Sequence, residues 1–151
     1  MPRTLPLALV LILVAASPAS PPPHPAHGTA HELLVENTDR NTALRIHLRA
    51  GEVFSVVYQH TMYDQPVTED FVVDEEGRIE LRAVTSPSAA VREYFGITSA
   101  GDRHAMTRTM PEIVFRIATG TAQRLKAGGV DRSFLELGEH GDRLVLRADP
   151  T

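Results

Sequence analysis

Three side chains able to bind a ligand or move a proton lie near the middle of the chain: His60, Thr61 and Glu69. An imidazole hydrogen-bonded to a carboxylate is fixed in one tautomer and can then hold a ligand carboxylate or a metal ion. A hydroxyl beside such an imidazole is also the start of a hydrolase, but the sequence shows no oxyanion hole. We expect His60 and Glu69 to meet. Three interpretations stay open: a ligand site, a small hydrolase built on these three residues, or a turn held rigid by polar contacts.

The segment over residues 58–71 carries a family resemblance. The order of His60, Thr61, Pro66, Val67, Glu69 and Phe71 resembles the bacterial domain of unknown function 1850 family, in which His-Ser, Pro-Val and Glu follow a strand. The flanks are similar too, at residues 51–58, 94–97 and 113–137, so the resemblance covers most of residues 34–146. It implies an exported accessory protein, because members of the family are often encoded beside tripartite substrate-binding-protein-dependent transporters. We expect the partner of this chain to be a small solute or a transporter component.

The three tyrosines of the chain lie in or near these regions. A tyrosine combines an apolar ring with a polar tip and often lines a binding surface. Tyr58 shares a strand face with Phe54 and Val56, so core packing is the simpler expectation for it. The candidate ligand-binding residues are therefore His60, Thr61, Tyr63, Pro66, Glu69 and Tyr94.

A second group of histidines precedes the folded part. His24, His27 and His31 lie three and four residues apart and can bind divalent copper, nickel or zinc, which makes a periplasmic metal-binding protein the alternative function. The sequence requires no cofactor, although such a metal is compatible with it. The other histidines, His47, His104 and His140, lie in polar stretches, and we expect them on the surface.

Alternating apolar and polar residues predict that strands position these side chains. In the strand over residues 53–60, Phe54, Val56, Tyr58 and His60 share one face, and the preceding strand over residues 43–49 is predicted to form a hairpin with it. Further strands are predicted over residues 69–73, 79–85, 113–118, 134–137 and 143–148, and one short helix over residues 88–95. We expect an all-β, mainly antiparallel fold: a small sandwich or a partly open barrel with at most one short helix.

The first residues predict export. Arg3 precedes a twelve-residue apolar run over residues 5–16, which is typical of a signal peptide. Cleavage fits after Ala16 or after Ala19, and we expect it after Ala19. Twelve helical residues rise only about 18 Å, too short to span a bilayer core of about 30 Å. We therefore predict a signal peptide over residues 1–19, a Pro- and His-rich linker over residues 20–31 and one β-rich domain over residues 32–149. The protein is expected to be periplasmic or extracytoplasmic, without a membrane span after cleavage and membrane-anchored if the signal stays.

Composition limits the partners. With 42% hydrophobic and 23% charged residues the chain resembles an ordinary globular protein. Its 15 Lys and Arg are outnumbered by 19 Asp and Glu, so no basic surface for nucleic acid is expected. The absence of cysteine excludes disulfides, thiolate metal sites and a cysteine nucleophile. A non-enzymatic binding protein of the bacterial envelope fits these limits better than an enzyme.

Overall fold

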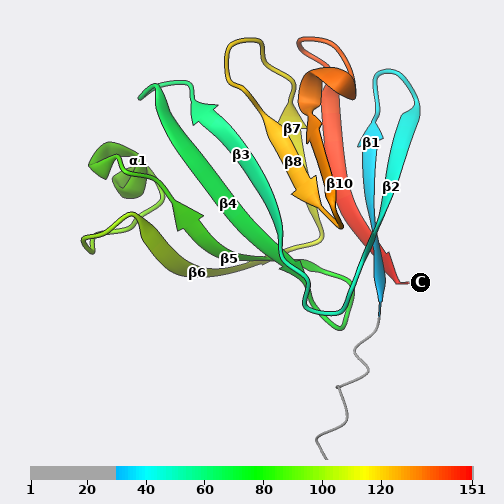
Figure 1. Ribbon diagram of the computed structural model, residues 1–151, viewed down its shortest axis with the longest axis horizontal. Coiled ribbons are helices and arrows are strands. Elements are labelled where there is room, and N and C mark those ends of the chain that lie inside the picture. The colour runs from blue at the N-terminus through cyan, green and yellow to red at the C-terminus, as the bar shows by residue number, and fades with distance from the viewer. Residues whose placement is uncertain (1–29, 151) are drawn as a thin grey trace, which may run out of the picture.

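A computed structural model describes residues 30–150 of the chain, and its strands form two antiparallel sheets that face each other (Figure 1). In spatial order the four-stranded sheet contains β2 (Thr42–Leu48), β1 (His31–Asn37), β10 (Arg143–Pro150) and β7 (Glu112–Arg116). The six-stranded sheet contains β6 (Arg103–Met110), β5 (Ile79–Thr85), β4 (Gln65–Val73), β3 (Phe54–His60), β8 (Arg124–Ala127) and β9 (Val130–Ser133). The predicted all-β fold is confirmed, in its sandwich form.

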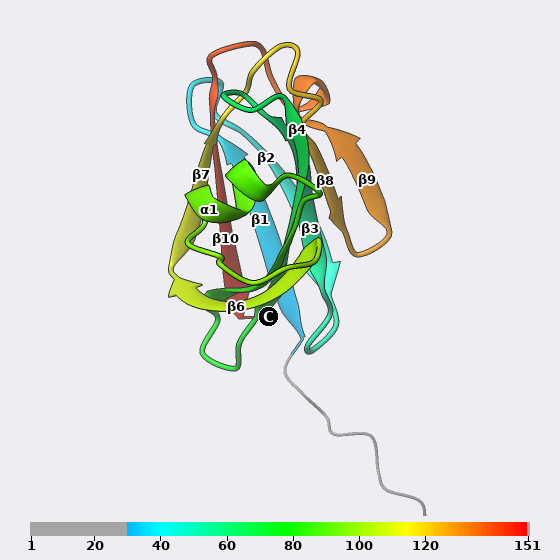
Figure 2. The ribbon, with the colours of Figure 1, turned by 90° about the vertical axis from the view of Figure 1, so that its left-hand side faces the viewer.

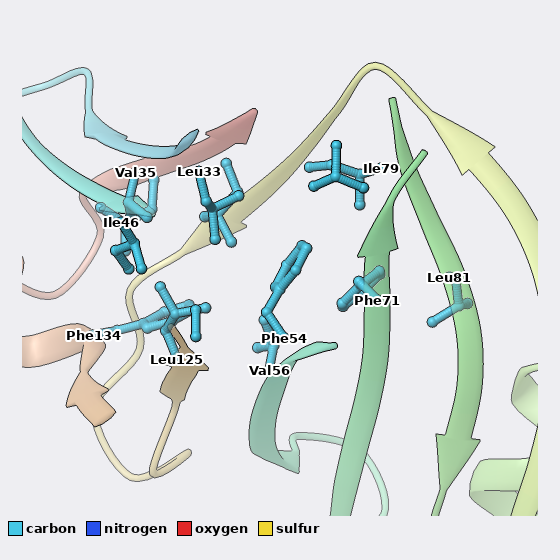
Figure 3. Close-up of a cluster of buried hydrophobic side chains, with 14 of the residues drawn as sticks. Leu33, Val35, Ile46, Phe54, Val56, Phe71, Ile79, Leu81, Leu125 and Phe134 are labelled. Carbon is cyan, nitrogen blue, oxygen red and sulfur yellow. The ribbon is translucent and has the colours of Figure 1, made fainter. Parts of the chain in front are cut away.

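The core lies between the sheets. Leu33, Val35 and Ile46 of the four-stranded sheet face Phe54, Val56 and Phe71 of the six-stranded sheet, and all are at most 3% exposed (Figure 3). The rings of Phe54 and Phe71 stack with centroids 5.3 Å apart. Fully burying one such side chain stabilises the fold by about 1.5–3 kcal/mol. The inward face predicted for the strand over residues 53–60 is therefore confirmed.

The hairpin predicted from the first two of these strands is wrong. β2 pairs with β1, whereas β3 pairs with β4 and β8, so the connection over residues 49–53 crosses from one sheet to the other. Both β2 and β3 bury one face. This pattern is the same whether two strands face each other across the core or lie side by side in one sheet. Periodicity alone does not distinguish the two arrangements.

Two short helical segments complete the fold. The predicted helix is α1 (Ala89–Tyr94), which begins after Ser88, whose Oγ accepts a hydrogen bond from the amide of Val91 at 3.3 Å. Gly96 follows at φ +76°, the left-handed conformation that closes many helices. The strand predicted over residues 134–137 is wrong, because Phe134–Glu136 form a 3₁₀ turn, η1, with a capping box between Ser133 and Glu136.

Helix α1 lies in front of the strands between β7 and β4 when the molecule is turned by 90° (Figure 2). Its Val91 is fully buried and belongs to the hydrophobic core, so the helix is held by packing as well as by its cap. This anchorage fixes Tyr94, which stands at the end of the same helix.

The first strand of the domain begins one residue earlier than the predicted domain boundary, at His31. His31 is the first residue of β1, paired with Leu48 and Pro150, and belongs to the sheet rather than to the linker. The predicted signal peptide and the histidines His24 and His27 lie outside the described residues. None of the helices within residues 30–150 has both the length and the apolar character needed to cross a bilayer.

Candidate ligand-binding site

The hairpin of β3 and β4 places His60 at its turn end. His60 pairs with Gln65, and the turn between them is closed by the amide of Asp64 donating to the carbonyl of His60 at 2.8 Å. Asp64 has a φ of +50°, a conformation that Asp and Asn tolerate better than most residues. The amide of Met62 donates to Nδ1 of His60 at 3.3 Å, so in the neutral imidazole the proton is on Nε2.

Two tyrosines enclose the His60 ring. Tyr63, from the same turn, stacks on it with centroids 5.0 Å apart and planes at 29°, and Tyr94 of α1 meets it edge-on at 4.9 Å and 76°. His60 is only 8% exposed, whereas Tyr94 is 63% exposed. Each aromatic contact of this kind is worth about 0.5–1.5 kcal/mol beyond the area it buries. The ring is therefore held rigidly, with Tyr94 between it and the solvent.

Glu69 does not bind His60, contrary to expectation. On the inner face of this hairpin the opposed pairs are His60 with Gln65, Tyr58 with Val67, and Val56 with Glu69. Glu69 is thus four residues from Gln65, about 13 Å along the strand. Its diagonal neighbour is Tyr58, whose hydroxyl donates to Oε1 of Glu69 at 2.5 Å.

The Tyr58–Glu69 pair is partly buried on the inner face of the hairpin, where both charged forms are disfavoured. Burial raises the pKa of Glu69 above its usual range, although the hydrogen bond from Tyr58 and the charge of Arg108 oppose that rise. The pKa of Tyr58 is also raised, first by burial and then by the neighbouring Glu69 carboxylate and by Tyr94. The tyrosine therefore stays protonated and acts as a hydrogen-bond donor.

A pocket of about 440 Å³ opens beside these residues. Its walls come from β3, the following turn, α1, β7 and the loop after β7. They are formed by Tyr58, Gln59, His60, Thr61, Met62, Tyr94, Phe115, Arg116, Ala118, Thr121 and Gln123. Nε2 of His60 has no hydrogen-bond partner among residues 30–150. The pocket thus combines aromatic walls with several polar groups, among them the free N–H of His60, the hydroxyl of Thr61 and the guanidinium of Arg116, a composition typical of small-molecule sites.

The structure brings together only some of the predicted site residues. His60, Tyr63 and Tyr94 are in contact, and Thr61 lines the pocket with an exposed side chain. Pro66 is exposed on β4, opposite Gln59, and takes no part in the pocket. Within the described residues, Thr61 makes no hydrogen bond to His60 and Glu69 binds Tyr58, so the contacts required by the hydrolase interpretation are not formed.

Sequence reasoning missed the role of Tyr58 and the contribution of the opposite sheet. Tyr58 shares the face of His60, which is a signal that it reaches the same space, but core packing was the simpler assignment. Phe115 and Gln123 come from about sixty residues further along the chain, and nothing in their local sequence marks them. The facing of the two sheets brings Phe115 to β3, whereas the pairing of β3 with β8 brings Gln123, whose neighbour Arg124 pairs with Val57.

The structure also shows where the other histidines of the described residues lie. His104, expected on the surface, is buried at 9% exposure, with Nδ1 3.0 Å from Oγ of Ser99 and Nε2 2.7 Å from the carbonyl of Gly101. His47 and His140 are exposed as expected. Among residues 30–150 no three histidine, aspartate or glutamate side chains come close enough to hold a metal by themselves.

Comparisons of the chain with protein-family models, with curated proteins and with solved structures found no match. The resemblance to the domain of unknown function 1850 family stays a prediction.

Proposed function

We propose that this chain is an exported, non-enzymatic binding protein that holds a small solute in the His60 pocket. The solute class that fits best has an apolar or flat body and a hydrogen-bond acceptor such as a carboxylate. The observation that carries this proposal is the imidazole of His60, clamped by two tyrosines, with an Nε2–H donor that no described residue satisfies.

The surroundings support a ligand with an apolar body and an anionic group, since Arg116 lines the pocket as well as His60. Phe115, Tyr94 and Met62 supply apolar walls, whereas the amide of Gln123 is already committed to the backbone of Ala118 and Arg116 at 2.9 Å each. Tyr58 likewise donates to Glu69 and is not free to donate again. A carboxylate that accepts from His60 forms a charge-assisted hydrogen bond, which is stronger than a neutral one.

The test is an NMR titration of the isotopically labelled protein with small carboxylic acids, for example benzoate and phenylacetate, each compared with its matched alcohol. We expect amide shifts confined to residues 58–63, 94 and 115–123, and weaker binding of the alcohols. Tyr94→Ala is expected to reduce the affinity about three- to tenfold, because it removes an aromatic contact. Val53→Ala, at a residue of similar exposure that does not line this pocket, is the control. Shifts spread over the whole surface, or the same affinity in Tyr94→Ala, contradict the proposal.

A second candidate is a protein partner, for which a transporter component is our proposal. It is favoured by Met62 and Tyr94, which flank the pocket and are 72% and 63% exposed. Exposed Met and Tyr side chains are enriched at the centre of protein interfaces. The test is a pull-down of the solute-binding protein of an adjacent transporter operon, with Met62→Ala and Tyr94→Ala expected to abolish capture and Val53→Ala to preserve it. Capture by all variants alike excludes this surface.

A further inference from the structure

The loop between α1 and β6 lies on the side of the molecule away from β1 and β2 (Figure 1), and it carries Ser99, the one exposed serine among residues 30–150. Oγ of Ser99 lies 3.0 Å from Nδ1 of His104, the second residue of β6. The other described serines, all at least partly buried, bind a carboxylate or backbone amides: Ser55, Ser86, Ser88 and Ser133. Ser99 is therefore the serine whose hydroxyl is both open to solvent and in contact with an imidazole.

The hydrogen bonds of His104 determine which of its nitrogens carries the proton. Nε2 lies 2.7 Å from the carbonyl oxygen of Gly101. A carbonyl oxygen only accepts, so Nε2 is the protonated nitrogen of the neutral ring. Nδ1 then has no proton, and it accepts the hydrogen bond from the hydroxyl of Ser99. A hydroxyl bound to a base that a third group orients is the arrangement that activates a serine nucleophile.

The surrounding structure holds this contact in place. His104 is only 9% exposed and pairs with Val84, which is fully buried. The loop is fixed at both ends, because the amide of Ile97 donates to the carbonyl of Arg92 at 2.9 Å and the amide of Ser86 donates to the carbonyl of Asp102 at 2.8 Å. The base and the hydroxyl are therefore positioned before any reagent arrives, which lowers the entropic cost of a reaction.

The same loop also contains unused hydrogen-bond donors. The backbone amides of residues 98–101 make no hydrogen bond with any described residue. When a hydroxyl attacks a carbonyl group, the oxygen of that group becomes negatively charged, and backbone amides are the donors that stabilise such an oxygen in proteins. The loop thus provides free donors in the segment that carries the hydroxyl of Ser99.

We propose that Ser99 is a covalent modification site that takes an acyl group from activated carboxylic esters, with His104 as the base. Oγ of Ser99 attacks the carbonyl carbon of the ester while its proton passes to Nδ1 of His104. The bond between that carbon and the alcohol oxygen then breaks, and the alcohol leaves with the proton from His104. The products are O-acylated Ser99 and one molecule of alcohol. Ser99 does not line the His60 pocket, so this reactivity is independent of the proposed function.

The test is incubation of the purified protein with p-nitrophenyl acetate at neutral pH, followed by mass spectrometry of its tryptic peptides. Cleavage after Arg92 and Arg103 releases one peptide that contains Ser99, Thr98 and Tyr94, and fragmentation of this peptide identifies the acetylated residue. Assistance by a general base accelerates such reactions by about a hundredfold or more. We therefore expect Ser99 to be acetylated at least about tenfold faster than its neighbour Thr98.

His104→Gln keeps a donor for the carbonyl of Gly101 but cannot take up a proton at neutral pH, so it should lower the acetylation rate of Ser99 at least about tenfold. Thr98→Ala, at an exposed neighbour whose side chain makes no hydrogen bond to a described residue, is the control and should react as the parent does. Unfolding the parent in urea should abolish the preference for Ser99, and this measurement stays informative if His104→Gln does not fold. Three results overturn the proposal: an unmodified Ser99 in a sample in which Lys126 is acetylated, equal Ser99 rates in the parent and in His104→Gln, or a preference that persists in urea.

Discussion

The hydroxyl of Tyr58 lies 2.5 Å from Oε1 of Glu69, on the inner face of the hairpin whose turn end carries His60. This contact gives a partly buried carboxylate its hydrogen-bond donor. Because Glu69 binds Tyr58, it does not form a catalytic pair with His60.

Removing the hydroxyl of Tyr58 should therefore lower the stability of the fold. In Tyr58→Phe the Glu69 carboxylate stays half-buried without its hydrogen bond, and we expect a loss of about 1–3 kcal/mol in the free energy of unfolding. Chemical denaturation measures it. Tyr63→Phe is the control, because the hydroxyl of Tyr63 makes no hydrogen bond to a described residue, and it should change stability by less than about 0.5 kcal/mol. Equal effects of the two variants contradict the assignment.

The same carboxylate predicts a pH dependence. Burial raises the folded-state pKa of Glu69 above its usual value of 4.5, so the native protein binds this proton more tightly than the unfolded chain does. The contribution of Glu69 to stability is then present below about pH 4.5 and is lost as the pH rises through the raised pKa. We expect Glu69→Gln to become more stable relative to the parent between pH 4 and pH 7, so that its free energy of unfolding rises relative to that of the parent. A difference that does not vary with pH excludes the shift.

Asp142 should show the opposite dependence. Hydrogen bonds from Asn37, from the amide of Glu139 and from Arg40 lower the pKa of Asp142 from 3.8 to about 2. Its contribution is present above pH 3.8 and is lost as the pH falls towards about 2. Asp142→Asn is expected to be less stable than the parent at pH 7, with the difference shrinking below pH 4. Urea unfolding at several pH values tests this, and a difference that grows in acid contradicts it.

Changing either of two glycines to alanine should destabilise the fold, for a different reason in each case. At Gly138 a Cβ atom would lie 2.2 Å from Nδ2 of Asn37, and Asn37 is only 2% exposed. Overpacking of this kind costs about 1–3 kcal/mol. At Gly96 a Cβ has open space, but φ is +76°, and that strain costs about 1–2 kcal/mol. Gly96→Asn should recover part of its loss, because Asn tolerates this conformation, whereas Gly138→Asn should recover none.

The cap of α1 links stability to the proposed site. Ser88→Ala removes the hydrogen bond to the amide of Val91 and is expected to cost about 1 kcal/mol. Because α1 carries Tyr94, we also expect faster hydrogen exchange in residues 89–95 and weaker carboxylate binding. Thr107→Ala, at an exposed residue of β6 whose side chain makes no hydrogen bond to a described residue, is the control. Unchanged exchange in Ser88→Ala means that packing of Val91 alone holds the helix.

The sequence allowed the fold class and several strands to be predicted because half-buried strands alternate, as in β3, where Phe54 and Val56 are fully buried. β6 was missed, because it is an edge strand whose exposed residues dilute that pattern. The error at residues 134–137 was avoidable, since Ser133 and Glu136 have the spacing of a capping box.

The site was only half predictable for a related reason. The nearness of His60 to Tyr63 is local and follows from the turn. The contact of His60 with Tyr94 and the position of Phe115 in the pocket wall depend on how α1 and β7 pack. The periodicity of the sequence does not indicate that packing. The expected pairing with Glu69 failed because the register of the hairpin, set by the turn over residues 61–64, places Tyr58 in between.

The pairing of β1 with β10 sets a condition on when this protein can fold. Within the described residues, β1 lies at the centre of its sheet against β10, with His31 opposite Pro150, so the four-stranded sheet stays incomplete until the eight residues of β10 have been synthesised. Contacts of such long sequence separation form slowly. A chain still emerging from a ribosome or a translocation channel therefore keeps its apolar strands unprotected, and C-terminal truncation should leave it dependent on chaperones.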